Sequence, residues 1–198
     1  GDSDRPLLLG VDASTRKVHF YGGDLLGMVV ASYLKADAVV VPISCNDAIN
    51  LSPLAAALQP KTKIGSPYVI SGMQQAAAKG YRTICGWEAN GGFLLGSDVV
   101  RNGNRLTALP TWDALLPIVG VLCSAREQNL SLAQLFQQLP RRYSKAALLS
   151  QFPRPISLKI MRRFSPETRD QDDISFASGT SNSLSEADRI RCELETFF

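Results

Sequence analysis

The sequence AVVVPI at residues 38–43 is a continuous apolar run rich in β-branched side chains, and it ends in the polar residues 44–47. Such a run is typical of a strand that is buried on both faces and opens into a polar loop. The preceding residues 24–35 place apolar side chains at helical spacing behind Asp24, which is well suited as an N-cap. A helix followed by a buried strand indicates an α/β protein.

The same alternation continues along the chain. We expect helices and strands in turn over residues 48–58, 62–64, 67–79, 82–85, 93–95 and 112–127. Ahead of them, two apolar segments at residues 6–9 and 17–20 flank turn-forming residues and predict a β-hairpin. The expected fold class is therefore α/β, with a layered, mostly parallel sheet and flanking helices.

The character of the sequence changes after residue 140. A linker or turn is expected over residues 152–155, a Ser- and Asp-rich loop over 165–185, and a last amphipathic helix over 186–198. No strands follow to cover that helix, so we interpret residues 150–198 as an incomplete C-terminal α+β piece.

Composition excludes several classes of function. The chain has 198 residues and a net charge of only +3, and no run of five like charges concentrates it, so we do not expect nucleic-acid binding. No apolar stretch is long enough for a membrane span. Four scattered cysteines and the single His19 form no zinc pattern, and free thiols are favoured over disulfides. We therefore expect a cytoplasmic protein. The four cysteines are Cys45, Cys85, Cys123 and Cys192.

Two short segments could carry chemistry. The first is GDSDR at residues 1–5, where Asp2 and Asp4 offer hard oxygen ligands for Mg²⁺ and Arg5 follows. The alternative is a solvated turn without a metal.

The second segment is GWEANGG at residues 86–92, a glycine-rich turn between two expected strands. The carboxylate of Glu88 and the amide of Asn90 could bind neighbouring sugar hydroxyls. The alternative is a structural hairpin with an exposed Glu88. No phosphate-binding G-x-x-x-x-G-K-[ST] loop and no G-x-G-x-x-G fingerprint occurs.

Taken together and in this order, these segments resemble the α-D-phosphohexomutases, the phosphomannomutase/phosphoglucomutase family. GDSDR looks like the family's metal loop D-G-D-x-D-R without its first aspartate, and GWEANGG matches the sugar loop G-x-E-A-N-G-G. Three segments between them also resemble family motifs in the expected order: GDLL at 23–26, VPIS at 41–44 and TKIG at 62–65.

The resemblance implies a domain organisation. Residues 1–20 would end the metal-loop domain 2, residues 21–140 would form the sugar-binding α/β domain 3, and residues 150–198 would begin the phosphate-binding domain 4. The phosphoserine of domain 1 and the R-P-S-G-N/T loop of domain 4 are not found in this chain. We therefore expect a part of a longer parent chain that is catalytically silent alone.

The resemblance also implies roles for individual residues. Asp2 and Asp4 would hold Mg²⁺, and Arg5 would act in catalysis beside the transferring phosphoryl group. Glu88 and Asn90 would bind the sugar.

One position departs from the family. Its members commonly carry a lysine at the start of the helix after the T-x-x-G turn, where this chain has Ile70 and Ser71. Lys63, beside Gly65 of that turn, is the candidate replacement, and the alternative is that the role of the lysine is absent in this branch of the family.

Two hypotheses about function follow. In the first, the chain is part of a phosphohexomutase, an isomerase of carbohydrate metabolism. It would interconvert the 1- and 6-phosphates of mannose or glucose through a phosphoserine and a bisphosphorylated sugar, with the remainder of the parent chain as its partner. In the second, it is a non-catalytic α/β ligand-binding or interaction module, and both loops are structural turns.

Overall fold

The computed structural model of the chain describes residues 4–12, 15–144 and 150–164. The chain forms two compact units, Gly1–Ser144 and Lys145–Phe198. In the second unit helix α5 spans Arg154–Phe164, so it begins inside the linker expected at residues 152–155, and Pro155 is compatible with the first turn of a helix. The loop and helix expected at residues 165–185 and 186–198 lie outside the described residues, and the assignment of these segments to family domains stays a prediction.

The first unit is built on a four-stranded sheet. Its strands are β3 (Ala38–Val40), β4 (Ile84–Trp87), β5 (Phe93–Leu95) and β8 (Leu109–Asp113), in the order β3-β4-β5-β8. Only β3 and β4 are parallel, so the sheet is mixed rather than mostly parallel. The reason is local: the short turn between β4 and β5 allows only antiparallel pairing, because a parallel pair needs a crossover of a dozen or more residues. The strand expected at 62–64 is reduced to a parallel bridge between Pro42 and Thr62.

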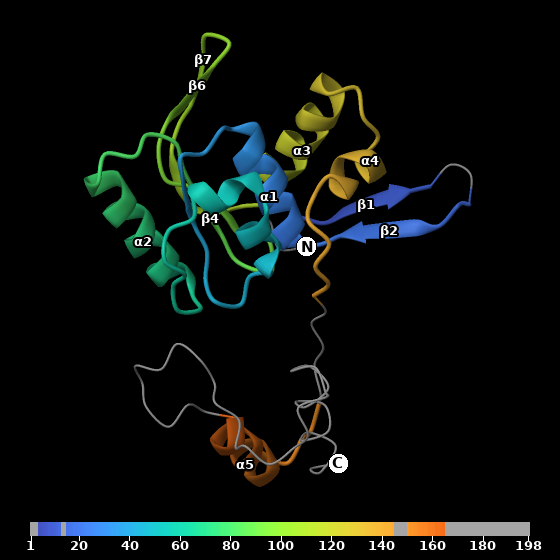
Figure 1. Cartoon of the computed structure of the whole chain (residues 1–198), viewed down its shortest axis with the longest axis vertical. Coiled ribbons are helices and arrows are strands. Elements are labelled where there is room, and N and C mark those ends of the chain that lie inside the picture. Colours follow the sequence, from blue (N-terminus) through green and yellow to red (C-terminus); the bar gives the residue numbers. More distant parts are fainter. Residues whose placement is uncertain (1–3, 13–14, 145–149, 165–198) are drawn as a thin grey trace. The chain divides into compact units, whose positions relative to one another are not determined.

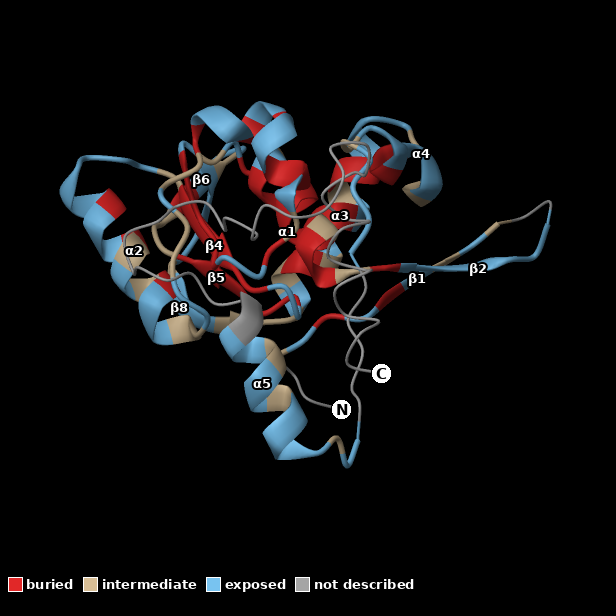
Figure 2. Ribbon diagram, turned by 60° about the horizontal axis from the view of Figure 1, so that its bottom comes forward, coloured by how far each residue is buried: buried red, intermediate tan, exposed pale blue. Residues whose placement is uncertain are grey.

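Helices cover both faces of this sheet, as Figures 1 and 2 show. Helix α2 (Ser66–Ala78) packs on one face, and α1 (Gly23–Tyr33) packs on the other with α3 (Leu115–Glu127) against it. Strand residues alternate between the two cores: Val39, Cys85, Trp87, Phe93 and Leu95 lie in the α1 core, and Val40, Ile84 and Leu94 lie in the α2 core. Strands β3, β4 and β5 are buried on both faces, which confirms the interpretation of their apolar runs and of the α/β fold class. Strand β8, at the edge of the sheet, is exposed or half-buried.

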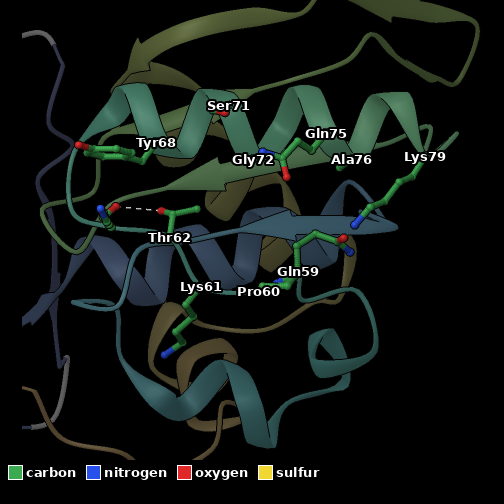
Figure 3. Close-up of a pocket in the computed structure, with 11 residues that line it drawn as sticks. Gln59, Pro60, Lys61, Thr62, Tyr68, Ser71, Gly72, Gln75, Ala76 and Lys79 are labelled. Atoms are coloured by element: carbon green, nitrogen blue, oxygen red, sulfur yellow. Dashed lines mark hydrogen bonds between the residues drawn. The ribbon is translucent and has the colours of Figure 1, made fainter. Parts of the chain in front are cut away.

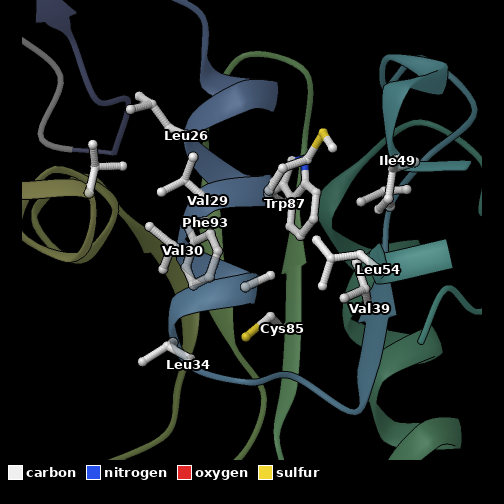
Figure 4. Packing of buried hydrophobic residues seen from close by; sticks show 14 of the residues in the cluster. Leu26, Val29, Val30, Leu34, Val39, Ile49, Leu54, Cys85, Trp87 and Phe93 are labelled. Atoms are coloured by element: carbon white, nitrogen blue, oxygen red, sulfur yellow. The ribbon is translucent and has the colours of Figure 1, made fainter. Parts of the chain in front are cut away.

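The α1 core is centred on Trp87, which lies between α1 and the segment that carries Ile49 and Leu54 (Figure 4). A Cβ atom at Gly27 would approach the Trp87 ring to 2.5 Å, so glycine at this position lets α1 rest directly on the indole.

Two sequence-based boundaries are wrong. The helix expected at residues 48–58 is two 3-10 turns, η1 (Asp47–Leu51) and η2 (Pro53–Ala56), because Pro53 lacks the N–H that a continuous helix needs. Helix α3 begins at Leu115 rather than at Trp112, because Trp112 belongs to β8 and the Asp113 carboxylate accepts a hydrogen bond from the Leu115 N–H.

Three short elements were not expected. Strands β6 (Val99–Arg101) and β7 (Asn104–Leu106) form a hairpin whose Asn-Gly turn was a usable signal. Helix α4 (Leu132–Gln137) begins with a capping box between Ser131 and Gln134.

The hairpin near the N-terminus is confirmed. Strand β1 (Leu8–Val11) pairs antiparallel with β2 (Val18–Tyr21), and Leu8 lies opposite Tyr21. The Tyr21 ring stacks on Phe136 at 4.1 Å between centroids, which anchors the chain just before α1.

The described cysteines Cys45, Cys85 and Cys123 are free thiols, in agreement with the sequence-based expectation. Burial raises the pKa of Cys85 to about 12, so this thiol stays protonated at neutral pH. Cys192 lies outside the described residues. In the described part of the chain no helix has the length and apolar character needed to cross a membrane. The cytoplasmic location stays a prediction.

Candidate functional site

The glycine-rich loop forms a tight turn that connects β4 to β5. The Gly91 N–H donates to the Glu88 carbonyl at 2.8 Å, and the Glu88 N–H donates to the Gly92 carbonyl at 3.1 Å. The Asn90 side-chain oxygen accepts the Gly92 N–H at 2.9 Å, and Gly91 has a φ of +95°, a conformation that favours glycine. The loop is therefore rigid, and the exposed Asn90 keeps its side-chain NH₂ available.

Glu88 is buried, with only 6% of its surface exposed, so the exposure expected for Glu88 in a structural hairpin is wrong. One carboxylate oxygen accepts the backbone N–H of Gly65 at 3.0 Å. Gly65 is the N-cap of α2, so Glu88 lies at the positive end of this helix. The sequence could not predict this contact, because the two residues are 23 positions apart.

Segments far apart in sequence meet at this loop. The beginning of α1 touches it so closely that a Cβ at Gly23 would come within 2.2 Å of the Gly91 Cα. A Cβ at Gly91 would lie 3.0 Å from the ring of Pro6, the residue after Arg5. The residue that follows the first candidate segment thus packs directly against the second.

Asp24 does not cap α1. Its carboxylate instead bonds to residues that flank the glycine-rich loop in the fold. Gly22 is the N-cap, and the Asp24 carboxylate is buried in the first turn. It accepts the Trp87 indole N–H at 3.1 Å and the Asn46 backbone N–H at 2.9 Å. Burial and the nearby Asp24 carboxylate raise the pKa of the Cys45 thiol, which stays neutral. One carboxylate therefore joins α1, the polar loop after β3 and the end of β4.

Asp4 and Arg5 lie beside the same loop. The Arg5 Nε lies 3.9 Å from an Asp4 carboxylate oxygen, and the Arg5 guanidinium carbon lies 5.8 Å from the centre of the Trp112 ring. That ring in turn packs against Gly92. The other Asp4 oxygen is buried and has no hydrogen-bond partner among the described residues. Asp2 lies outside the described residues.

Lys63 is exposed and its ammonium group lies 5.9 Å from the centre of the Tyr68 ring. It lines a groove of about 330 Å³ between residues 59–63 and one polar side of α2, shown in Figure 3. Lys61 at this groove points away from α2 and pairs with Asp47 at 2.6 Å. Lys63 therefore places a cation near the turn at Gly65, but it is not one of the residues that Glu88 bonds to.

The structure thus gathers Asp4, Arg5, Glu88 and Asn90 around one loop. The part of the chain that the structure describes has no cluster of three or more His, Cys, Asp or Glu side chains that could hold a metal. Sequence reasoning missed the supporting role of Asp24 and the position of Trp112 beside Arg5. The apolar strand before Glu88 indicated that Trp87 is buried. The hydrogen bond from Trp87 to Asp24 could not be predicted from sequence, because it depends on how the chain folds.

Residues 22–143 match the family model of the phosphoglucomutase/phosphomannomutase α/β/α domain III. The chain belongs to this family. The match covers the sheet, its helices on both faces and the glycine-rich loop.

Curated relatives agree with this assignment. A phosphomannomutase of Salmonella muenchen is 40% identical over 161 residues, which are 81% of this chain and 32% of that protein. A phosphomannomutase of Sinorhizobium fredii (strain NBRC 101917 / NGR234) is 39% identical over 132 residues, which are 67% of this chain and 26% of that protein. The chain thus spans about a third or less of the length of the phosphomannomutases it matches.

Solved structures share the fold. The crystal structure of Aspergillus fumigatus N-acetylphosphoglucosamine mutase in complex with GlcNAc-6P and magnesium covers 83% of this chain with a TM-score of 0.53. The match spans 39% of that protein at 14% sequence identity, so it shows the architecture alone.

Proposed function

We propose that this chain is the sugar-binding part of a phosphohexomutase that interconverts hexose 1-phosphate and hexose 6-phosphate, with mannose or glucose as the sugar. The observation that carries this proposal is the packing of Pro6 on Gly91, which brings Asp4 and Arg5 next to the loop of Glu88 and Asn90. Charged groups for a phosphate and polar groups for a sugar then share one surface. The 40% identity to a phosphomannomutase supports the same reaction class.

The side chains have distinct roles in this proposal. Glu88 uses one carboxylate oxygen for Gly65 and offers the other to a sugar hydroxyl, and the Asn90 NH₂ donates to a second hydroxyl. Because Glu88 is buried and held by the N-terminus of α2, it needs little reorganisation on binding. Arg5 supplies a permanent positive charge for phosphoryl oxygens.

Mg²⁺ is the cofactor that fits Asp4. Its buried oxygen without a hydrogen-bond partner among the described residues is a suitable ligand for a hard cation, and Asp2 would be the second carboxylate. When bound, the ion would neutralise charge on the transferring phosphoryl group. Arg5 binds phosphoryl oxygens next to Asp4, and Glu88 and Asn90 orient the sugar.

The phosphoserine and the domain 4 phosphate loop would come from the remainder of the parent chain. The chain spans only about a third or less of the phosphomannomutases it matches, which supports the proposal that other parts of the parent chain supply these groups. The chain alone is accordingly expected to be silent in a mutase assay.

The Glu88→Gln variant of the parent protein tests the proposal. Loss of a charge-assisted hydrogen bond to a substrate hydroxyl should lower kcat/KM by about 10- to 150-fold on mannose 1-phosphate or glucose 1-phosphate. Because the amide still accepts the Gly65 N–H, the free energy of unfolding should fall by only about 1 kcal/mol.

The matched control is Glu127→Gln, the same chemical change on α3, where the carboxylate bonds to Arg101 and Tyr33. Its turnover should equal that of the unmodified protein. If Glu88→Gln keeps full turnover on both sugars, the sugar-binding role is refuted and the alternative of a non-catalytic module gains support.

A further inference from the structure

Two buried side-chain polar atoms in the described part of the chain have no hydrogen-bond partner: an oxygen of Asp4 and the indole nitrogen of Trp112. Both lie beside Arg5, which is 3.9 Å from the other Asp4 oxygen and 5.8 Å from the Trp112 ring centre. An unpaired buried polar group costs about 1–3 kcal/mol, so such groups are rare and call for an explanation. Mg²⁺ explains the Asp4 oxygen but leaves the Trp112 N–H unexplained.

The fold fixes the Trp112 indole in place. Trp112 lies in β8, one residue before Asp113, which pairs with Phe93 at the beginning of β5. A Cβ at Gly92 would come within 3.0 Å of the Trp112 ring, so the ring packs flat against the sugar loop. An N–H on a ring held in this way is a preorganised donor.

The other tryptophan provides the comparison. Trp87 lies within the loop sequence at residues 86–92, but its indole N–H already donates to Asp24 at 3.1 Å. Of the two indoles in the chain, only that of Trp112 has an N–H without a hydrogen-bond partner among the described residues.

We propose that the Trp112 indole N–H donates a hydrogen bond to a phosphoryl oxygen of the bound hexose phosphate, next to Arg5. This inference rests on the proposed function. The acceptor should be anionic because the Arg5 cation lies over the same ring, and guanidinium and indole N–H donors together suit one phosphoryl group. Trp112 thus becomes a substrate-binding residue that also holds Arg5 over the sugar loop.

The test uses the two indole ¹H–¹⁵N signals of the full chain, with the Trp112→Phe variant to assign them. In the presence of Mg²⁺, mannose 1-phosphate, glucose 1-phosphate and inorganic phosphate should each move the Trp112 indole proton downfield. The Trp87 signal should stay in place, and unphosphorylated mannose should move neither signal.

Calorimetric titration supplies a second measurement. Trp112→Phe keeps an aromatic ring on Gly92 and should weaken mannose 1-phosphate binding about 10-fold, because one hydrogen bond to a charged group is lost. The control Tyr33→Phe also removes a donor and keeps a ring, but its hydroxyl donates to Glu127 at the end of α1 that does not touch the loop, and the Kd of this variant should not change.

The outcomes of these experiments distinguish failure of the proposed role of Trp112 from failure of the proposed function. If the sugar phosphate binds while the Trp112 signal stays still, or if mannose alone moves it equally, this inference is overturned and the proposed function stands. If neither sugar phosphate binds the chain at all, the proposed sugar-phosphate surface fails, and the role of Trp112 fails with it.

Discussion

A Gly23→Ala substitution should lower the free energy of unfolding by about 3 kcal/mol, because overpacking against backbone has no side-chain rotation to relieve it. The added Cβ would lie 2.2 Å from the Gly91 Cα and 2.3 Å from its nitrogen. Either α1 or the sugar loop must therefore move, and mutase activity of the parent protein should fall with stability. Chemical denaturation followed by circular dichroism measures the change.

The neighbouring glycine is a close control. A Cβ at Gly22 would have the Phe20 ring as its nearest neighbour, at 3.9 Å, and the φ of Gly22 is −65°, which alanine readily adopts. Gly22→Ala should cost at most about 1 kcal/mol, the difference between glycine and alanine at an N-cap. Equal effects of the two substitutions would show that α1 and the loop do not touch as described.

Asp24→Ala is the second substitution with a large expected effect. It leaves the Trp87 indole N–H and the Asn46 N–H without their acceptor, and both were bonded to a buried charge. Each such loss costs about 1.5–3 kcal/mol, so a total of about 3 kcal/mol or more is expected from thermal or urea unfolding.

Asp47→Ala serves as the comparison, since it removes a carboxylate whose side chain is 73% exposed and pairs with Lys61. An exposed ion pair contributes at most about 1 kcal/mol, so this variant should unfold almost like the unmodified chain. An Asp24→Ala protein as stable as Asp47→Ala would contradict the supporting role of Asp24.

The apolar runs were sufficient to predict the strands around residues 38–43 and 93–95 and the helix over 67–79. These elements are fixed by local pattern: strands buried on both faces need apolar residues at every position, and α2 has Pro67 in its first turn and Gly80 just after its end. The parallel or antiparallel pairing of the strands was harder to predict from sequence, because it depends on which strands are neighbours in space. The mixed sheet follows from the short turn after Trp87, which limits β4 and β5 to antiparallel pairing.

The candidate site was predictable to the level of its motifs. Glycines at 86, 91 and 92 pointed to a tight turn with Glu88 and Asn90 in it, and the turn is there. Local sequence contains no sign that Glu88 is buried against Gly65, that Asp24 turns inward to Trp87, or that Trp112 lies beside Arg5. These contacts join elements separated by tens of residues, so they are products of the fold.

In the proposed function, residues 4–6 and 88–92 form one binding surface for a sugar phosphate. Mapping the backbone amide signals of the chain during titration with glucose 1-phosphate and Mg²⁺ tests it most directly. We expect the signals that move to cluster at Asp4, Arg5, Gly65 and residues 88–92, and mannose 1-phosphate should move the same set. Signals that move only along the groove between residues 59–63 and α2, with residues 4–6 and 88–92 unchanged, would contradict it.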